Sequence, residues 1–212
     1  RELAAVNQID NGYVYVQVTR GDGLLRNHGF LSYEEQQPVF SGFAQSSVRS
    51  EEKMIHGADA ITVEDRRSLM CNVKSLNLLP NCLAKHAAQK KGVSKALMVR
   101  DGIVTEEKSG NIFIVKDGVV LTHPDGGKIL PGITKKLILN ILHTRHIPVW
   151  EKEFSEEEML HADEVMVTDT NSEIVPIIKI NDQIIGSGKR GEITQDIQIA
   201  YKALIEETCG KL

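Results

Sequence analysis

The chain has 212 residues, 41% of them hydrophobic and 25% charged, which is the mix of a globular protein with one sizeable core or two smaller lobes. A net charge of −4 argues against generic binding to nucleic acid or to a membrane surface, and no apolar run is long enough to span a bilayer. Three cysteines without CxxC spacing, Cys71, Cys82 and Cys209, indicate a reducing cytoplasm with no disulfide framework and no zinc site.

The predicted elements, taken in chain order, favour an α+β fold. Residues 1–10 lack a Met and read as the end of a helix, so we expect that the chain is a fragment or has lost an N-terminal segment. Strands are predicted over 12–21, 38–47, 59–66, 95–107, 111–123 and 161–186. Helices are predicted over 75–92, 131–147 and 191–210, with a loop over 21–37 and a polar connector over 46–60. Strands dominate the middle, which favours α+β over a regular βαβ array.

Glycines mark several turns. The pairs Asp101-Gly102 and Asp117-Gly118 predict tight turns between strands. The stretch "GSGKRG" (186–191) matches the pattern G-x-G-x-x-G, but a dinucleotide site also needs a βαβ unit and a following acidic residue. Because a single helix follows before the chain ends, we expect a turn that leads into that helix.

Lys74 stands inside an apolar stretch, "MCNVKSLNLLPN" (70–81). A lysine is rarely fully buried unless it is paired or has a chemical task. Desolvation lowers the pKa of a buried lysine and turns its amine into a nucleophile that forms a Schiff base with a carbonyl group. The sequence therefore marks Lys74 as a candidate reactive amine.

Two segments have the composition of anion-binding loops. In "PGITKK" (131–136), the amides of Ile133 and Thr134 are expected at a helix N-terminus, where Gly132 permits close approach of a ligand. An ordinary helix cap is the alternative. The stretch "TDTNSE" (168–173) offers hydroxyls and amides after a strand. The two loops together have the groups to bind one phosphate.

An acid and a basic pair complete the set. Glu106 ends an apolar strand and is either a solvated turn residue or the partner of a cation in a pocket. Arg26 and His28 share one side of an extended segment and are either surface charges or a clamp for a carboxylate. These groups together suit pyridoxal 5′-phosphate (PLP), because PLP is an aldehyde that carries a phosphate. A binding site for it would use a reactive lysine, an acidic residue, anion-binding loops and a carboxylate clamp for the substrate.

Four segments then resemble a known family. "NVKSLNLLPN", "VTEEKSGNIF", "KILPGIT" and "TDTNSE" are similar to motifs of the fold-type IV PLP enzymes, which include D-amino-acid aminotransferases, branched-chain aminotransferases and aminodeoxychorismate lyase. The resemblance runs from about "VYVQVTRG" to the last helix. It implies an α+β fold of two lobes, in which residues 1–48 are the remnant of an apparently truncated small lobe and residues 49–212 form the PLP-binding lobe.

The resemblance implies a role for each motif residue. Lys74 would form the internal aldimine with PLP and carry the proton, and Glu106 would pair with the pyridine nitrogen. The residues that would contact the rest of the cofactor are Leu130 on the ring face and Gly132, Ile133, Thr134, Asp169 and Thr170 at the phosphate. Arg26 and His28 would bind the substrate carboxylate, because "RNH" resembles the R-x-H carboxylate trap of the D-amino-acid aminotransferases.

Three features depart from the family pattern. Asp169 stands where a small hydroxyl residue is common, so either its backbone amide contacts the phosphate or its side chain points away. Lys108 stands where a small polar residue is usual, and it either competes for Glu106 or reaches solvent. Family members also carry a longer N-terminal lobe with a phosphate-binding arginine and an active-site tyrosine, and neither has an evident equivalent before Arg26.

The expected activity is PLP-dependent transamination between a D-amino acid, such as D-alanine, and a 2-oxo acid. Two alternatives stay open: an aminodeoxychorismate lyase that eliminates pyruvate from the same lysine, and a catalytically silent fragment that serves as an oligomerisation or binding domain. A branched-chain aminotransferase fits less well, since R-x-H is not its usual carboxylate site. The resemblance also implies a homodimer in the cytoplasm, with small-molecule substrates and no nucleic-acid, membrane or metal partner.

Overall fold

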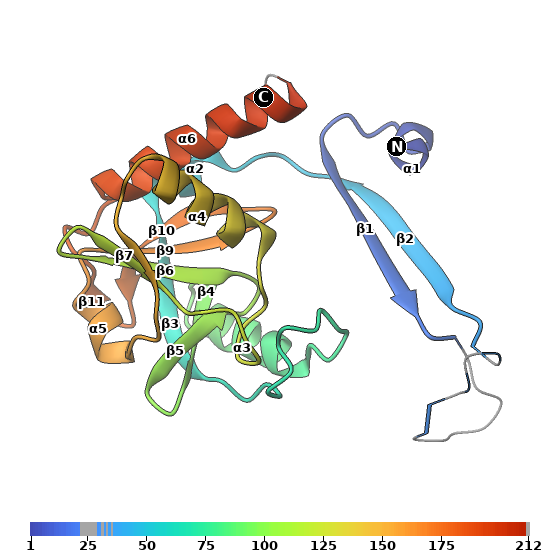
Figure 1. The fold of residues 1–212 in the computed structure, drawn as a ribbon, viewed down its shortest axis with the longest axis horizontal. Coiled ribbons are helices and arrows are strands. Elements are labelled where there is room, and N and C mark those ends of the chain that lie inside the picture. Colours follow the sequence, from blue (N-terminus) through green and yellow to red (C-terminus); the bar gives the residue numbers. More distant parts are fainter. Residues whose placement is uncertain (22–28, 31, 33, 35, 211–212) are drawn as a thin grey trace. The chain divides into compact units, whose positions relative to one another are not determined.

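The computed structural model describes residues 1–21, 29–30, 32, 34 and 36–210 (Figure 1). The chain forms two compact units, Arg1–Arg49 and Ser50–Leu212. This division lies one residue beyond the expected lobe boundary between residues 48 and 49. In the described part of the chain, no helix is both long and apolar enough to cross a membrane.

The first unit is a short helix followed by a β-ribbon. Its elements are α1 (Glu2–Val6), β1 (Gly12–Thr19) and β2 (Val39–Ser46). The two strands pair antiparallel over their whole length, and Tyr15 stacks on Phe43 across the ribbon with ring centroids 5.2 Å apart. Alternating β-branched and aromatic residues suit this pleated surface. The predicted strands over 12–21 and 38–47 are confirmed.

The second unit is built on a mixed sheet. Its strands are β3 (Ala58–Glu64), β4 (Lys95–Arg100), β5 (Ile103–Glu107), β6 (Asn111–Lys116), β7 (Val119–Thr122), β8 (Val149–Glu151), β9 (Glu164–Asp169), β10 (Glu173–Ile180) and β11 (Gln183–Ile184). The strand order is β5-β4-β3-β10-β9-β6-β7-β8, and β11 pairs with β10. The pairs β3–β10, β3–β4 and β7–β8 are parallel and the others antiparallel. This mixed topology is the expected α+β architecture.

The helices of this unit are α2 (Glu51–His56), α3 (Leu79–Lys90), α4 (Ile133–Thr144), α5 (Glu156–Leu160) and α6 (Glu192–Cys209). The three long helices confirm the predictions from helical spacing. The short α2 lies where a polar connector was expected, and α5 was missed. A capping box between Ser155 and Glu158 begins α5, and this local signal was available in the sequence.

The sheet is covered on both faces. Along β6, Ile112 and Ile114 pack into one apolar cluster, while Phe113 packs into another with side chains of α4 and α6. The two long helices lie on the same side of the sheet (Figure 1). The alternation follows from the two-residue period of a strand, so residues 111, 113 and 115 share the face of α4.

Tight turns join the neighbouring antiparallel strands. Asp101 and Gly102 both have positive φ (52° and 79°), as do Asp117 and Gly118 (50° and 74°). Two successive residues with positive φ are typical of the turns that match strand twist, and Asp and Gly tolerate that conformation best. Both turn predictions are confirmed. The first turn sends β5 back along β4, and the chain then turns again into β6.

Candidate functional site

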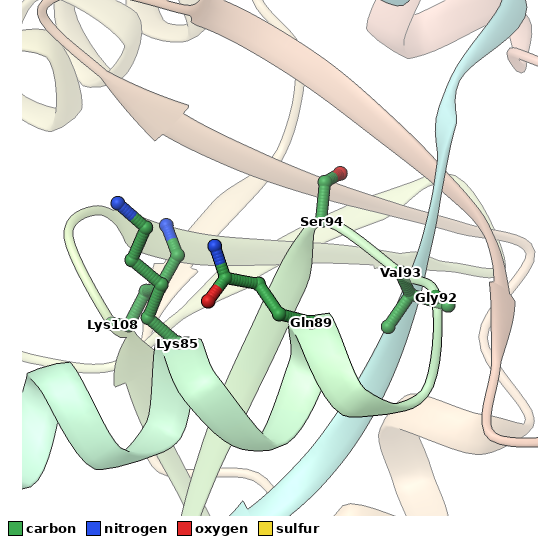
Figure 2. A pocket seen from close by; sticks show the side chains of 6 residues that line it. All are labelled: Lys85, Gln89, Gly92, Val93, Ser94 and Lys108. Atoms are coloured by element: carbon green, nitrogen blue, oxygen red, sulfur yellow. The ribbon is translucent and has the colours of Figure 1, made fainter.

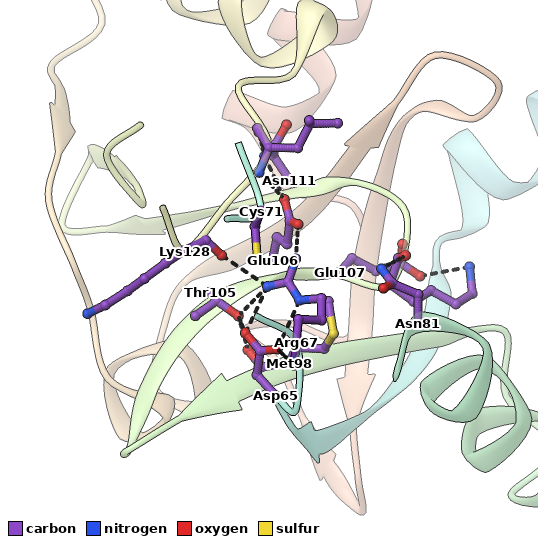
Figure 3. A network of polar contacts seen from close by, with 12 residues as sticks. Asp65, Arg67, Cys71, Asn81, Met98, Thr105, Glu106, Glu107, Asn111 and Lys128 are labelled. Atoms are coloured by element: carbon purple, nitrogen blue, oxygen red, sulfur yellow. Dashed lines mark hydrogen bonds and ion pairs between the residues drawn. The ribbon is translucent and has the colours of Figure 1, made fainter. Parts of the chain in front are cut away.

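Asn111, the first residue of β6, links several of the residues expected at a cofactor. Its Nδ2 donates a hydrogen bond to the carbonyl oxygen of Leu130 at 2.9 Å and a longer one to Oε2 of Glu106 at 3.4 Å. The backbone amide of Leu130 in turn donates to Glu106 Oε2 at 2.9 Å. Figure 3 shows Glu106 and Asn111. The structure therefore brings Glu106 and Leu130 together.

Gly132 packs against the same asparagine. A Cβ atom at this position would clash with Oδ1 of Asn111. The backbone of Gly132 has φ −68° and ψ 137°, which any residue adopts, so the requirement for glycine here is one of space. The start of α4 is thereby held directly beside the first residue of β6.

The N-terminus of α4 has the features of an anion site. The N-cap residue Gly132 has no side chain to cap the helix, and the first turn contains no acidic residue. In the described part of the chain, the amides of Ile133 and Thr134 have no hydrogen-bond acceptor. Unsatisfied amides and the helix dipole together favour a bound anion.

The N-terminus of α6 is different. Its amides at Ile193 and Thr194 donate to the carboxylate of Glu164 on β9, at 3.0 and 2.8 Å. The helix that follows "GSGKRG" is therefore capped by the protein's own anion. The predicted turn before this helix is confirmed, since Gly186 and Gly188 adopt positive φ in the connection that leads to α6.

The second expected anion loop follows β9. Asp169 accepts hydrogen bonds from the amides of Asn171 (2.8 Å) and Ser172 (2.7 Å), and one of its oxygens lies 3.5 Å from Lys95 Nζ. Its side chain is thus turned into its own loop, which is one of the two alternatives raised from the sequence. Thr170 follows and is exposed.

This loop lies beside the start of β6. Thr168 is the sheet partner of Asn111, and a Cβ on Gly110 would lie 3.2 Å from that of Asp169. The hydroxyl of Thr168 is buried and has no hydrogen-bond partner among the described residues. Thr168 shares a strand face with Met166, which packs against the helices, so this hydroxyl lies on the α4 side of the sheet.

Glu106 is buried and its environment is strongly charged. Burial raises the pKa of Glu106 to about 7, while Arg67 and the amide of Leu130 act to lower it. Arg67 forms an ion pair with Glu106 and binds Asp65 through Nε and Nη2 at 2.9 and 2.8 Å. Burial also disfavours the Asp65 carboxylate, but hydrogen bonds from Arg67 lower the pKa of Asp65 to about 2.

Sequence reasoning missed Asp65, Arg67 and Asn111. The charged stretch that follows β3 was the one available signal for the first two, because charged residues directly after a buried strand have to be paired. Lys108, which was considered as a competitor for Glu106, instead pairs with Glu107, with 3.0 Å between Nζ and Oε1. Lys108 therefore does not compete with Arg67 for the ion pair with Glu106.

Lys74 is exposed, and the expectation that it is buried is wrong for this structure. It lies in the irregular connection between β3 and α3, where Val73 and Leu76 are also exposed, at 50% and 57%. The apolar stretch is surface and not core. This connection is attached to the loop before α4, because the amide of Cys71 donates to the carbonyl oxygen of Gly127 at 2.9 Å.

Arg26 and His28 lie outside the described residues. A separate pocket of about 450 Å³ lies beside α3 (Figure 2) and is lined by Lys85, Gln89, Gly92, Val93, Ser94 and Lys108. None of the residues expected to bind the cofactor or substrate lines it. The candidate site is therefore the region around Asn111.

Comparisons with known proteins identify the family. Residues 1–180 match the model for amino-transferase class IV, so the chain belongs to that family. The D-alanine aminotransferase of Staphylococcus haemolyticus is 43% identical over 206 residues, which are 97% of this chain and 72% of that protein.

Solved structures agree on the fold. The Escherichia coli branched-chain amino acid aminotransferase superposes with a TM-score of 0.80 and 25% identity, covering 100% of this chain and 70% of that one. A putative 4-amino-4-deoxychorismate lyase from Legionella pneumophila gives a TM-score of 0.83 at 18% identity, covering 95% and 73%. The α+β, fold-type IV prediction is confirmed.

Replacing Asp65 tests the charged cluster. Because its pKa falls from 3.8 to about 2 on folding, the carboxylate contributes about 2 kcal/mol of stability above pH 4, which is lost as the pH falls through 2. Urea unfolding of wild type and Asp65→Asn should give a stability difference that shrinks by about 1 kcal/mol from pH 5 to pH 3. The exposed Asp196→Asn is the control, and a pH-independent difference for Asp65→Asn would contradict the assignment.

Proposed function

We propose that this aminotransferase exchanges an amino group between a D-amino acid, such as D-alanine, and a 2-oxo acid with PLP as its cofactor. The observation that carries the proposal is 43% identity to a D-alanine aminotransferase over nearly the whole chain. The amino group leaves one carbon skeleton as the other receives it, so the products are again one 2-oxo acid and one D-amino acid.

The residues of the candidate site fit PLP. An uncapped pair of amides at Ile133 and Thr134 suits a phosphate, and the partnerless hydroxyl of Thr168 lies on the same side of the sheet. The buried carboxylate of Glu106 suits a protonated ring nitrogen. When bound, PLP supplies an electron sink for the electrons of the substrate Cα–H bond.

Each residue then has a defined task. Gly132, Ile133 and Thr134 hold the phosphate with the loop at Asp169 and Thr170, where backbone groups act because the Asp169 side chain is engaged elsewhere. Glu106 accepts the hydrogen bond of the ring nitrogen, and Leu130 packs on the ring.

The remaining roles, the reactive amine and the substrate-carboxylate clamp, belong to Lys74 and to Arg26 with His28. Lys74 would hold the cofactor through its aldehyde carbon, with release of water, and would carry the proton that leaves the substrate Cα; its exposure leaves the side chain accessible for this. Arg26 and His28 bind the substrate α-carboxylate, a role supported by the R-x-H pattern in the sequence.

A lyase is the second candidate, on the same lysine. Its support is the similar fold of the Legionella protein. At 18% identity, this similarity is evidence for the fold and not for the reaction. Assays with D-alanine plus 2-oxoglutarate and with aminodeoxychorismate separate the two reactions. A folded protein that binds no PLP would instead support the catalytically silent alternative.

Lys74 is the first residue to test. Borohydride reduction of the protein with PLP should place the label on Lys74 in peptide mass mapping, and Lys74→Ala should lose at least about a thousandfold in transamination. Lys90→Ala, an exposed lysine at the end of α3, should retain activity. A label on Lys108, or an active Lys74→Ala, would refute the assignment.

Gly132 tests the phosphate site. Gly132→Ala should displace Asn111, remove its hydrogen bond to Leu130 and weaken PLP binding by about tenfold. Gly126→Ala is the matched control, because its Cβ would meet nothing within 4 Å. Fluorescence titration with PLP measures both variants, and equal affinities would place the phosphate elsewhere.

We also propose a homodimer in the cytoplasm. Apolar side chains are exposed along the connection from β3 into α3, namely Leu69, Met70, Val73, Leu76, Leu78, Leu79 and Leu83. Exposed apolar side chains concentrated in one segment favour association. Analytical ultracentrifugation at micromolar concentration should give a dimer, and Leu79→Asp should shift it to monomer; a monomeric wild type would contradict the proposal. The free cysteines fit a reducing compartment.

A further inference from the structure

Glu106 belongs to a cluster of four charged residues, which we name the Arg67 cluster: Asp65, Arg67, Arg100 and Glu106. Figure 3 shows Asp65, Arg67 and Glu106 of this cluster. Arg67 lies between the two carboxylates, and 6% of its side chain is exposed. Its guanidinium also donates to Thr105 Oγ1 at 3.2 Å and to the carbonyl oxygen of Lys128 at 3.0 Å. Five donors in a fixed plane make this set of contacts possible, and a lysine cannot reproduce it.

The two arginines share Asp65 and differ in their other partners. Arg100 lies 3.1 Å from Asp65 Oδ1 and donates to the backbone carbonyl of Arg67 at 2.7 Å. It supports Asp65 and the turn that carries Arg67. In the described part of the chain, the cation in contact with Glu106 is Arg67.

We propose that Arg67, held by Asp65, is a positioning residue that favours the carboxylate form of Glu106 and fixes its orientation toward the cofactor ring. This inference rests on the proposed role of Glu106 at the ring nitrogen. Asp65 takes Nε and Nη2 of the guanidinium, which leaves Nη1 for Oε1 of Glu106. The other oxygen, Oε2, is held by Leu130 and Asn111, so the carboxylate is fixed at both ends.

Arg67 opposes the groups that raise the pKa of Glu106. Burial raises the pKa of Glu106 to about 7, and Asp65 also acts to raise it, whereas Arg67 lowers it. Nearby, Cys71 donates its thiol hydrogen to Ser68, and Glu107 is paired with Lys108. The value of about 7 already includes the lowering by Arg67, so without Arg67 the pKa of Glu106 would lie higher still, and more of the carboxyl would be protonated and unable to favour a positively charged ring nitrogen.

The experiment compares Arg67→Gln with Arg67→Lys and with Arg66→Gln. Arg66 is the adjacent residue, is exposed and pairs with Glu64, so Arg66→Gln removes an arginine from the same turn without touching Glu106. The first readout is the titration of the Glu106 carboxyl carbon by carbon-13 NMR in the full chain without cofactor, assigned with Glu106→Gln. The second is the acid limb of kcat/KM for D-alanine in the PLP-loaded protein.

The expected result is that Arg67→Gln raises both midpoints by at least about one pH unit, while Arg66→Gln leaves them unchanged. Arg67→Lys, which keeps the charge but loses the fork, should give an intermediate shift. Unchanged midpoints in Arg67→Gln would overturn the inference, as would a shifted NMR titration with an unchanged acid limb. If Arg67→Gln does not fold, an unshifted Arg67→Lys overturns it in the same way.

Failure of the proposed function gives a different result. A wild type that takes no PLP label on Lys74 contradicts the function and, with it, the role of Arg67 toward the ring. The NMR titration of the cofactor-free chain still decides whether Arg67 favours the carboxylate form of Glu106. A wild type labelled on Lys74, with equal titrations in all variants, contradicts the inference alone.

Discussion

The burial of one carboxylate, that of Glu106, organises the surrounding structure. A charged group taken out of water needs hydrogen bonds and a counter-ion, and here they come from three different parts of the chain. Arg67 comes from the connection after β3, Leu130 from the loop before α4, and Asn111 from the first residue of β6. Satisfying this one group therefore fixes two irregular segments against the sheet, and α4 begins where the second of them ends.

The two long helices on one side of the sheet, α4 and α6, show how a residue distant in sequence decides whether a helix N-terminus can bind an anion. Both α4 and α6 begin after a glycine N-cap, and neither is capped by its own side chain. Glu164 reaches the amides of α6 from β9 and supplies the anion there. No equivalent carboxylate bonds the first amides of α4 among the described residues. The glycine-rich sequence "GSGKRG" thus precedes α6, whose N-terminal amides are already bonded to Glu164. The sequence "PGIT" begins α4, whose first amides are available to an anion.

The sequence predicted what depends on local pattern and missed what depends on distant partners. Periodicity located the long helices and the strands, while α2 and α5 were too short to produce it. Glu106 and Gly132 were chosen from the residue pattern and Leu130 through the family resemblance, and the structure places all three around Asn111. Arg67 was missed because its role depends on contacts with Thr105 and Glu106, which lie 38 and 39 positions further along the chain.

Lys74 shows why an apolar neighbourhood in sequence does not establish burial. Its apolar neighbours are turned to solvent, where each loses the stabilisation of about 25 cal/mol per Å² that covering would give. In the proposed dimer, a second chain that covers this surface would remove water from the apolar residues and from the lysine together.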